Sequence, residues 1–302
     1  MQLNQLLVVI DPTSKESQPA LQRAQWLALK SQAKVELLIC DYHSALDNTL
    51  FGDHSAQHKA RAALLAEHLN WLEELAQPLR EQGTKVTTQV RWGKVLYQEI
   101  IAHAKALKPD VLLRNATTHG LFQRLFFSNT SWQLIRFCPL PVWLVRDTPW
   151  NGNKLAAALD PTHTDDKAAS LDHQLIKTTQ ALAETLGMQA NYVHSYNTLP
   201  SMYTFEAEVV ISYDVYLKSI AELHEQSFNT LLDDYAIDNE QRKLLSGAPE
   251  HAIPQYINSQ SIDLLVMGAI SRSQVENALI GNTAERILEN STCDLLVVKP
   301  LS

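Results

Sequence analysis

The sequence contains few cysteines and no long apolar run. Its three cysteines, Cys40, Cys138 and Cys293, are odd in number, far apart and flanked by apolar residues. We expect them to be small buried side chains, because a disulfide framework or a zinc site has paired or closely spaced cysteines. No segment approaches the run of about 18 apolar residues that a membrane span needs. Disulfide-bonded and membrane-spanning architectures are therefore not expected.

Targeting and nucleic-acid-binding signals are also missing. The first five residues, Met-Gln-Leu-Asn-Gln, lack the basic start and apolar stretch of a secretory signal, which predicts a cytoplasmic protein. The net charge of −8 is unevenly divided: residues 1–150 carry 16 Lys+Arg and 13 Asp+Glu, or +3, and residues 151–302 carry 9 and 20, or −11. Neither half has the clustered basic residues that contact a phosphate backbone, so we expect no direct nucleic-acid partner.

An internal repeat divides the chain into two halves of ordinary domain size. It predicts one domain over residues 1–149 and a second over 152–302, with the linker at about 150–153. Three pairs of matching segments support the repeat, and their displacements differ by only four residues. The pairs are 6–13 with 155–162, which both end in Asp-Pro-Thr and are displaced by 149, and 109–113 with 262–266 and 128–130 with 281–283, both displaced by 153.

Strand and helix periodicities alternate along each half. Near-continuous apolar strands such as 35–39 and 142–145 need cover on both faces, and helical crossovers make neighbouring strands parallel. We therefore predict an α/β protein with two tandem, doubly wound, five-stranded parallel sheets related by a pseudo-twofold axis. The expected helices are 16–31, 56–82, 94–107, 130–137, 167–186, 214–235, 250–259 and 283–290, and the strands after the first of each half are 34–40, 85–91, 110–114, 141–146, 188–194, a weak strand at 241–246, 262–267 and 294–298.

A ligand site is expected beyond the carboxyl ends of the strands, where open parallel sheets form their binding crevice. In the second half, the turn after the first strand, the end of the second strand and a glycine-containing loop after the fourth strand meet there. Glycines let backbone N–H groups approach an anion, and a helix N-terminus adds unpaired donors and a positive dipole end. The candidate ligand-binding residues are Asp160, Val193, His194, Gly268, Ser271, Gly281, Asn282 and Thr283.

The glycine loop resembles the Gly-x2-Gly-x9-Gly-Ser/Thr motif with which nucleotide-binding members of the universal stress protein family hold the phosphates of ATP. The chain matches this motif at Gly268 and Gly281 and departs from it at Ser271 and Asn282. The tandem layout and the Gly-Asn-Thr-Ala-Glu run at 281–285 resemble tandem members of this family over essentially the whole chain. The two departures predict weak or absent ATP binding.

The resemblance implies the universal stress protein fold, which is like that of the adenine nucleotide α-hydrolases. It also implies a non-catalytic protein that supports resistance to stress such as DNA damage. In this family the last strands pair across a dimer of domains, so strands 142–145 and 295–298 are expected to form an internal pseudo-dimer, with a further homodimer as an open option. In the first half Asn115 and Ser128 replace the loop glycines, and we expect that site to be empty.

Local structural roles compete with ligand binding at three candidate residues. Asn282 could be a helix N-cap, with Glu285 completing a capping box. Asp160 could form an Asx turn with the residues that follow it. His194, at a strand end, could be hydrogen-bonded locally. The sequence leaves these alternatives open.

Two functions follow from these observations. The first is a stress protein whose second domain binds a nucleotide-like or phosphorylated ligand, with ATP as one possibility. The alternative is an ATP-independent scaffold for an apolar or amphiphilic ligand or a protein partner, for which the apolar segment 199–216 would supply a wall. Because no nucleophile elbow, Walker lysine loop, Cys-x-x-Cys pair or complete metal-ligand set is found, we expect neither an enzyme nor a metal site.

Overall fold

The chain forms two compact units, Met1–Asp147 and Thr148–Ser302. This division comes from a computed structural model, which describes residues 1–15, 17–47, 54–116, 128–162, 166–197, 207–269 and 280–300. Within each unit five strands form a parallel sheet covered by helices. The predicted α/β class and the doubly wound parallel sheets are confirmed.

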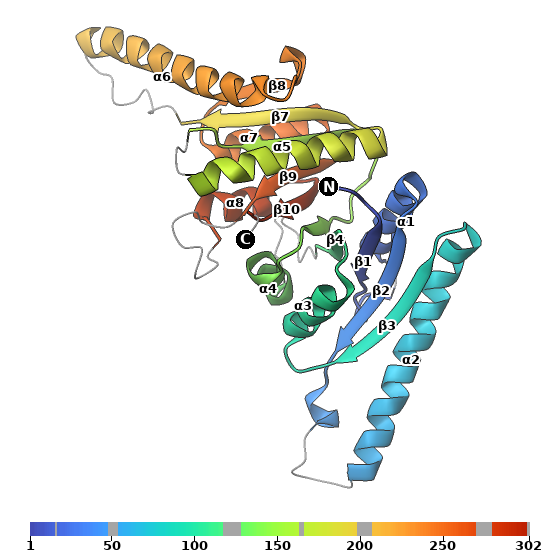
Figure 1. Cartoon of the computed structure of the whole chain (residues 1–302). Coiled ribbons are helices and arrows are strands. Elements are labelled where there is room, and N and C mark those ends of the chain that lie inside the picture. The colour runs from blue at the N-terminus through green and yellow to red at the C-terminus, as the bar shows by residue number, and fades with distance from the viewer. Residues whose placement is uncertain are drawn as a thin grey trace. The chain divides into compact units, whose positions relative to one another are not determined.

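Unit 1 has the strand order β3-β2-β1-β4-β5, and each neighbouring pair is parallel. Helices α3 and α4 lie on one side of these strands, and α1 and α2 lie on the other (Figure 1). The elements are β1 (Gln5–Val9), α1 (Pro19–Ser31), β2 (Lys34–Asp41), η1 (Ser44–Leu46), α2 (His54–Glu81), β3 (Val86–Trp92), α3 (Leu96–Leu107), β4 (Val111–Asn115), α4 (Asn129–Phe137) and β5 (Val142–Val145).

Unit 2 repeats this order as β8-β7-β6-β9-β10, again with parallel neighbours. The helix that follows the second strand is long in both units (Figure 1). The elements are β6 (Lys154–Leu159), α5 (Asp166–Leu186), β7 (Gln189–Tyr196), α6 (Ala207–Asp233), η3 (Asn239–Gln241), β8 (Arg242–Ser246), α7 (Pro249–Gln260), β9 (Leu264–Gly268), α8 (Asn282–Asn290) and β10 (Asp294–Val298).

Strands β1, β4, β5, β9 and β10 are buried on both faces, which explains their continuous apolar sequences. All residues of Leu6–Val9, Val111–Leu113, Val142–Val145, Leu264–Met267 and Leu295–Val298 are buried. Trp143 on β5 has one of the largest fully buried side chains. Burial of this apolar surface is the main favourable term for each unit.

A single aspartate fixes the start of the central strand in each unit. In unit 1, Oδ2 of Asp110 accepts hydrogen bonds from the backbone N–H groups of Asn4 and Gln5, at 2.6 and 2.8 Å. In unit 2, the carboxylate of Asp263 accepts from the N–H groups of Asn151, Asn153 and Lys154, at 3.0, 2.9 and 3.0 Å. Each aspartate directly precedes the fourth strand of its unit, so it ties the amino end of the first strand to that of the fourth.

The predicted elements agree with the observed ones within a few residues, with two exceptions. The helix expected from residue 16 begins at Pro19, because proline suits the first helical turn and disfavours helix at the residue before it. The helix expected from residue 214 begins at Ala207, so much of the apolar connection 199–216 is helical. The weak strand expected at 241–246 is β8, which pairs with β7.

Two expectations concern the chain as a whole. None of the helices in the described ranges is long and apolar enough to span a membrane. The pairing of strands 142–145 and 295–298 between the two units stays a prediction.

The three cysteines are buried and form no disulfide, as predicted. Burial raises the pKa of the Cys40 thiol to about 12, so its reactive thiolate is scarce at neutral pH. We therefore expect a disulfide reagent such as 5,5′-dithiobis(2-nitrobenzoate) to label no cysteine rapidly in the folded protein and all three in guanidinium chloride. Fast labelling of any cysteine in the folded protein, seen as thionitrobenzoate release, would contradict this.

Candidate functional site

The turn after β6 places Asp160 at the carboxyl edge of the unit 2 sheet. Its backbone N–H donates to Oδ1 of Asp172 on α5 at 3.2 Å, and its own Oδ1 accepts from the Thr162 hydroxyl at 3.1 Å. The carboxylate is therefore engaged in its own turn, as the local interpretation predicted. Unit 1 has the same arrangement at Asp11, whose N–H donates to Gln18 at 3.3 Å.

Two histidines form a hydrogen-bonded pair beside this turn. His194 lies at the end of β7 and is only 2% exposed. Its Nδ1 is 3.1 Å from the carbonyl oxygen of Leu159, and its Nε2 is 2.8 Å from Nδ1 of His224 on α6. The ring of Phe228 lies 5.8 Å from that of His194, and the ring of Tyr196 stacks on that of His224 at 5.1 Å. His194 is thus hydrogen-bonded locally, and His224 extends the site from α6.

The two imidazoles are held in their neutral forms by burial. Desolvation lowers the pKa of His194, although its bond to the Leu159 carbonyl and the Asp160 carboxylate act in the opposite direction. Desolvation also lowers the pKa of His224, again against an opposing effect of Asp160. Asp160 therefore acts electrostatically on both rings, which places turn, strand end and helix in one site.

Gly268 ends β9 and is required by packing rather than by backbone conformation. A Cβ at this position would lie 2.6 Å from Cδ2 of Leu171, a buried residue of α5. The loop glycine thus allows a close approach of α5 to the end of β9. The apolar side chain of Leu171 occupies the space beside Gly268, so an anion would have to bind on the α8 side of the loop.

Helix α8 begins at Asn282, and its N-cap is Gly281. The interpretation of Asn282 as the N-cap is therefore wrong, because the helical conformation starts one residue earlier than that interpretation requires. Gly281 has no side chain with which to cap the helix, so within the described residues the first-turn N–H groups, which include those of Asn282 and Thr283, have no N-cap side chain as acceptor. The N–H of Gly281 donates to the carbonyl of Ala269 at 3.1 Å. It is therefore already engaged, whereas the sequence predicted that it would face an anion.

In unit 1, residues with hydrogen-bonding side chains stand at the positions that correspond to Gly268 and Gly281. Asn115 stands where unit 2 has Gly268, and its side chain accepts from the N–H of Ala20 at 2.8 Å and donates to Gln18 at 3.2 Å. Ser128 stands at the N-cap of α4, where its hydroxyl accepts from the N–H of Ser131 at 3.2 Å. Side chains of unit 1 therefore bind the backbone groups that an anion would contact.

Two other predicted ligand-binding residues, Val193 and Ser271, add no side-chain contact to the described site. Val193 is fully buried, so only its backbone could meet a ligand. Ser271 lies outside the residues that the structure describes.

Sequence reasoning missed His224 and Asp172. Both lie on the buried faces of their helices, and each interrupts an apolar stripe with a polar side chain: Asp172 follows Leu171, and His224 precedes Phe228 by one turn. A polar residue at a buried helical position was the available signal.

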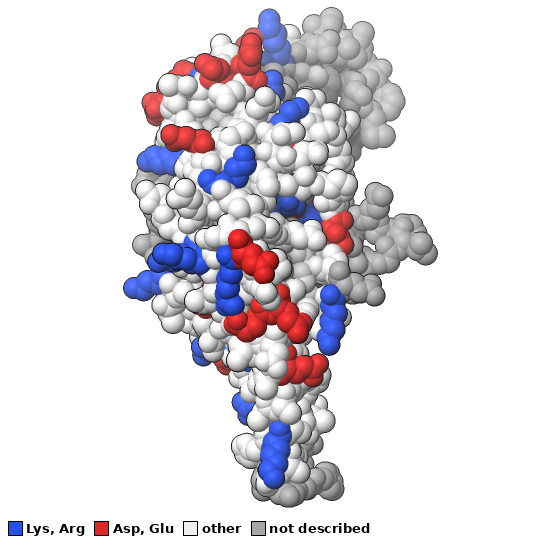
Figure 2. Space-filling model, turned by 90° about the vertical axis from the view of Figure 1, so that its right-hand side faces the viewer, with Lys and Arg blue, Asp and Glu red and all other residues white. Residues whose placement is uncertain are grey.

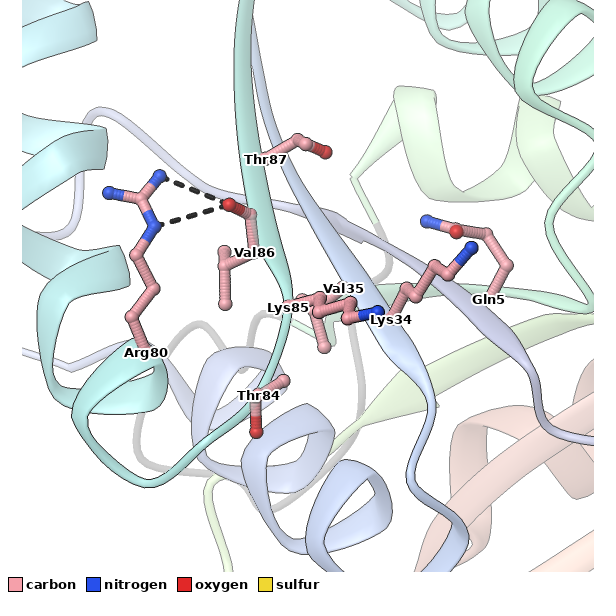
Figure 3. Close-up of a pocket in the computed structure, with 8 residues that line it drawn as sticks. All are labelled: Gln5, Lys34, Val35, Arg80, Thr84, Lys85, Val86 and Thr87. Carbon is pink, nitrogen blue, oxygen red and sulfur yellow. Dashed lines mark hydrogen bonds between the residues drawn. The ribbon is translucent and has the colours of Figure 1, made fainter.

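A cavity of about 350 Å³ lies at the opposite, amino edge of the unit 1 sheet. Figure 3 shows that the guanidinium of Arg80 is turned to the backbone carbonyl of Val86, and it also pairs with Glu73. The cavity is therefore separate from the crevice, and none of the predicted site residues that the structure describes lines it. Its lining residues are Gln5, Lys34, Val35, Arg80, Thr84, Lys85, Val86 and Thr87.

Charged side chains of both signs are interspersed on the face shown in Figure 2. This face shows no extended cationic area of the kind that binds a nucleic-acid backbone.

The repeated fold matches that of a known family. The universal stress protein family matches the chain twice, over residues 3–146 and 164–299. The chain therefore belongs to the universal stress protein family, with two family domains in tandem.

Relatives of similar length are found among curated proteins. The chain is 29% identical to universal stress protein E of Salmonella typhi and 28% identical to that of Escherichia coli K12, over 98% of this chain and 94% and 93% of those proteins. The crystal structure of a protein from Pseudomonas aeruginosa UCBPP-PA14, described as a universal stress protein, shares 27% identity and a TM-score of 0.75 over 99% of this chain and 94% of that chain.

The two loop glycines should respond differently to alanine. Gly268→Ala forces Leu171 to move in a packed region, which we expect to cost about 1–3 kcal/mol of the free energy of unfolding. Gly281→Ala places its Cβ in open space and should cost about 1 kcal/mol or less. Chemical denaturation of both variants measures the difference. Equal losses would show that packing against Leu171 does not explain Gly268.

The histidine pair should make the stability of unit 2 depend on pH. Both pKa values are lowered in the folded state, so below about 6.5 the unfolded chain binds more protons than the folded one. The stability that the neutral pair contributes to the folded state is fully present above about pH 6.5 and is lost as the pH falls. We expect the thermal unfolding midpoint to fall less between pH 7 and 5 in His224→Gln than in the unaltered protein. Parallel pH profiles would contradict the assignment.

Proposed function

We propose that this chain is a cytoplasmic, non-catalytic stress-response protein whose unit 2 binds a nucleotide-like or phosphorylated ligand. Unit 1 serves as its structural partner. The observation that carries this proposal is the contrast at the helix after the fourth strand: Ser128 caps α4 in unit 1, whereas Gly281 leaves α8 without a side-chain cap in unit 2.

Elementary electrostatics favours an anion at the start of α8. The unpaired N–H groups and the helix dipole together give this end a partial positive charge. The exposed residues Asn282 and Thr283 leave it accessible. Two features weaken the site for ATP: unit 2 lies in the half with a net charge of −11, and Leu171 fills the space beside Gly268. We therefore expect ATP to bind weakly.

Several features support a binding protein rather than an enzyme. Within the described ranges, no group of three or more His, Cys, Asp or Glu side chains could hold a metal ion. The polar groups of the crevice are mostly engaged with one another, as Asp160 is with Thr162 and Asp172. Support of resistance to stress such as DNA damage follows from the family and is part of the proposal.

Helix α6 favours a second candidate function, in which the chain binds an apolar or amphiphilic ligand or a protein partner without ATP. Val215 and Leu223 on this helix are 63% and 56% exposed, and Tyr216 is also exposed. Mass spectrometry of the small molecules that copurify with the protein distinguishes the two candidates, because a phosphorylated compound supports the first and an acyl or other apolar compound the second.

We further propose that the two units form an internal dimer through their last strands, β5 and β10. The support for this is the tandem occurrence of two domains of one family. An experimental structure with these strands on opposite outer surfaces would exclude it. A homodimer of the whole chain is compatible with it and would be seen in the molar mass in solution.

Substitution of the N-cap of α8 tests the proposed anion site. Gly281→Asp puts a carboxylate in open space, where it can accept the first-turn N–H groups and repel a phosphate. We expect the affinity for ATP, measured by calorimetry or ligand-observed NMR, to fall about tenfold or more, without a loss of thermal stability.

The matched control is Ser128→Asp, which places the same carboxylate at the N-cap of α4 in unit 1. It should leave ATP binding unchanged. The assignment to unit 2 would be wrong if Ser128→Asp reduced ATP binding and Gly281→Asp did not.

A further inference from the structure

The hydrogen-bonding pattern of His194 and His224 determines where their protons lie. A backbone carbonyl can only accept, so the Nδ1 of His194 must donate to the carbonyl of Leu159. In the neutral ring the Nε2 of His194 is then an acceptor, and the Nδ1 of His224 must donate to it. Both neutral histidines are therefore protonated at Nδ1.

In this assignment Nε2 of His224 carries no proton, and the other three ring nitrogens of the pair take part in the two hydrogen bonds. Within the residues that the structure describes, no hydrogen bond to Nε2 of His224 is found. An additional proton must enter the pair at this atom, whichever ring carries the positive charge. The pair thus behaves as one titrating group with a single site of protonation.

The charged groups around the pair give this proton an electrostatic consequence. Asp160, after β6, acts on both imidazoles, and Tyr196 on β7 stacks on His224. On β8, Arg242 is paired with Asp233, and Lys243 lies in register with Val193. Glu222 and Glu225 are the neighbouring acids of α6. A proton on the pair therefore offsets the charge of Asp160 in the crevice.

Unit 1 holds a histidine at the corresponding position of its long helix with a different partner. His68 on α2 is displaced from His224 by 156 residues, and β2 and β7 begin 155 residues apart. The Nε2 of His68 bonds to the carboxylate of Asp41 at 2.8 Å. In unit 1 a protonated histidine would thus meet a carboxylate directly, whereas in unit 2 His224 meets a second imidazole.

We propose that the His194–His224 pair takes up one proton at Nε2 of His224, and that this proton makes the unit 2 crevice a better site for an anionic, phosphate-bearing ligand as the pH falls. The proposal rests on the proposed function for its ligand. It assigns to His224 a binding role that depends on its protonation state, and to His194 the role of fixing the tautomer of His224.

The protonation pattern is tested without any ligand. Two-bond ¹H–¹⁵N NMR of the full chain reports the tautomer and titration of each imidazole, with the His194→Gln and His224→Gln variants used for assignment. We expect Nδ1–H forms for both rings at pH 8 and one proton gained by the pair at acidic pH. A His224 ring protonated at Nε2 at pH 8, or two separate proton uptakes by the pair above pH 5, would overturn the proposal.

The consequence for binding is tested with ATP at pH 8 and at pH 5, which is well below the ordinary imidazole pKa of about 6.5. We expect the ratio of the ATP affinities of the unaltered protein and His224→Gln to rise severalfold between these pH values, because the proton adds one positive charge to the crevice. Because ATP titrates identically in both measurements, its own protonation cancels. The matched control is His251→Gln, which removes an exposed imidazole of α7. The ratio of the ATP affinities of the unaltered protein and His251→Gln should be the same at both pH values.

The two proposals fail in different ways. ATP binding that is equal for the unaltered protein and His224→Gln at both pH values overturns the inference about His224 and leaves the proposed function intact. No detectable binding of ATP at either pH, with the NMR pattern as expected, counts against ATP as a ligand and against the binding consequence, while the shared proton of the pair stands.

Discussion

The geometry of both crevices depends on the aspartate that precedes the fourth strand of each unit. Asp110 and Asp263 accept the first backbone N–H groups of the central strand and so fix its register against the fourth strand. A slip of one residue would turn every side chain of that strand to the other face. Because parallel strands carry this alignment to their far ends, the turn at Asp160 and the end of β9 at Gly268 meet at the same edge.

The same scaffold supports different chemistry in the two units because single residues at that edge differ. Asn115 and Ser128 accept hydrogen bonds from backbone N–H groups with their own side chains, which stabilises unit 1. Gly268 and Gly281 make no such bonds, and α5 packs closely onto Gly268 instead. Unit 2 thus lacks the stabilising N-cap bond that Ser128 provides, and the start of its last helix stays accessible.

Most of the fold could be predicted from the sequence because buried parallel strands are continuous apolar runs and the repeat doubles every signal. The candidate site was harder to predict. The positions of Asp160 and His194 follow from strand ends, which are local features, whereas His224 reaches the site only because α6 packs back onto β7 and β8. The N-cap of α8 was misplaced by one residue, since Asn282 and Gly281 are both acceptable caps by residue type.

The edge strand β8 of the unit 2 sheet also bears on how the chain behaves at high concentration. β8 is short, carries Arg242 and Lys243 side by side, and holds Arg242 to the backbone carbonyl of Ile237 and to Asp233. Charged side chains on a short outermost strand oppose the addition of a foreign strand to its unpaired backbone groups. The charged side chains of β8 thereby keep this edge of the unit 2 sheet from pairing with the sheets of other copies.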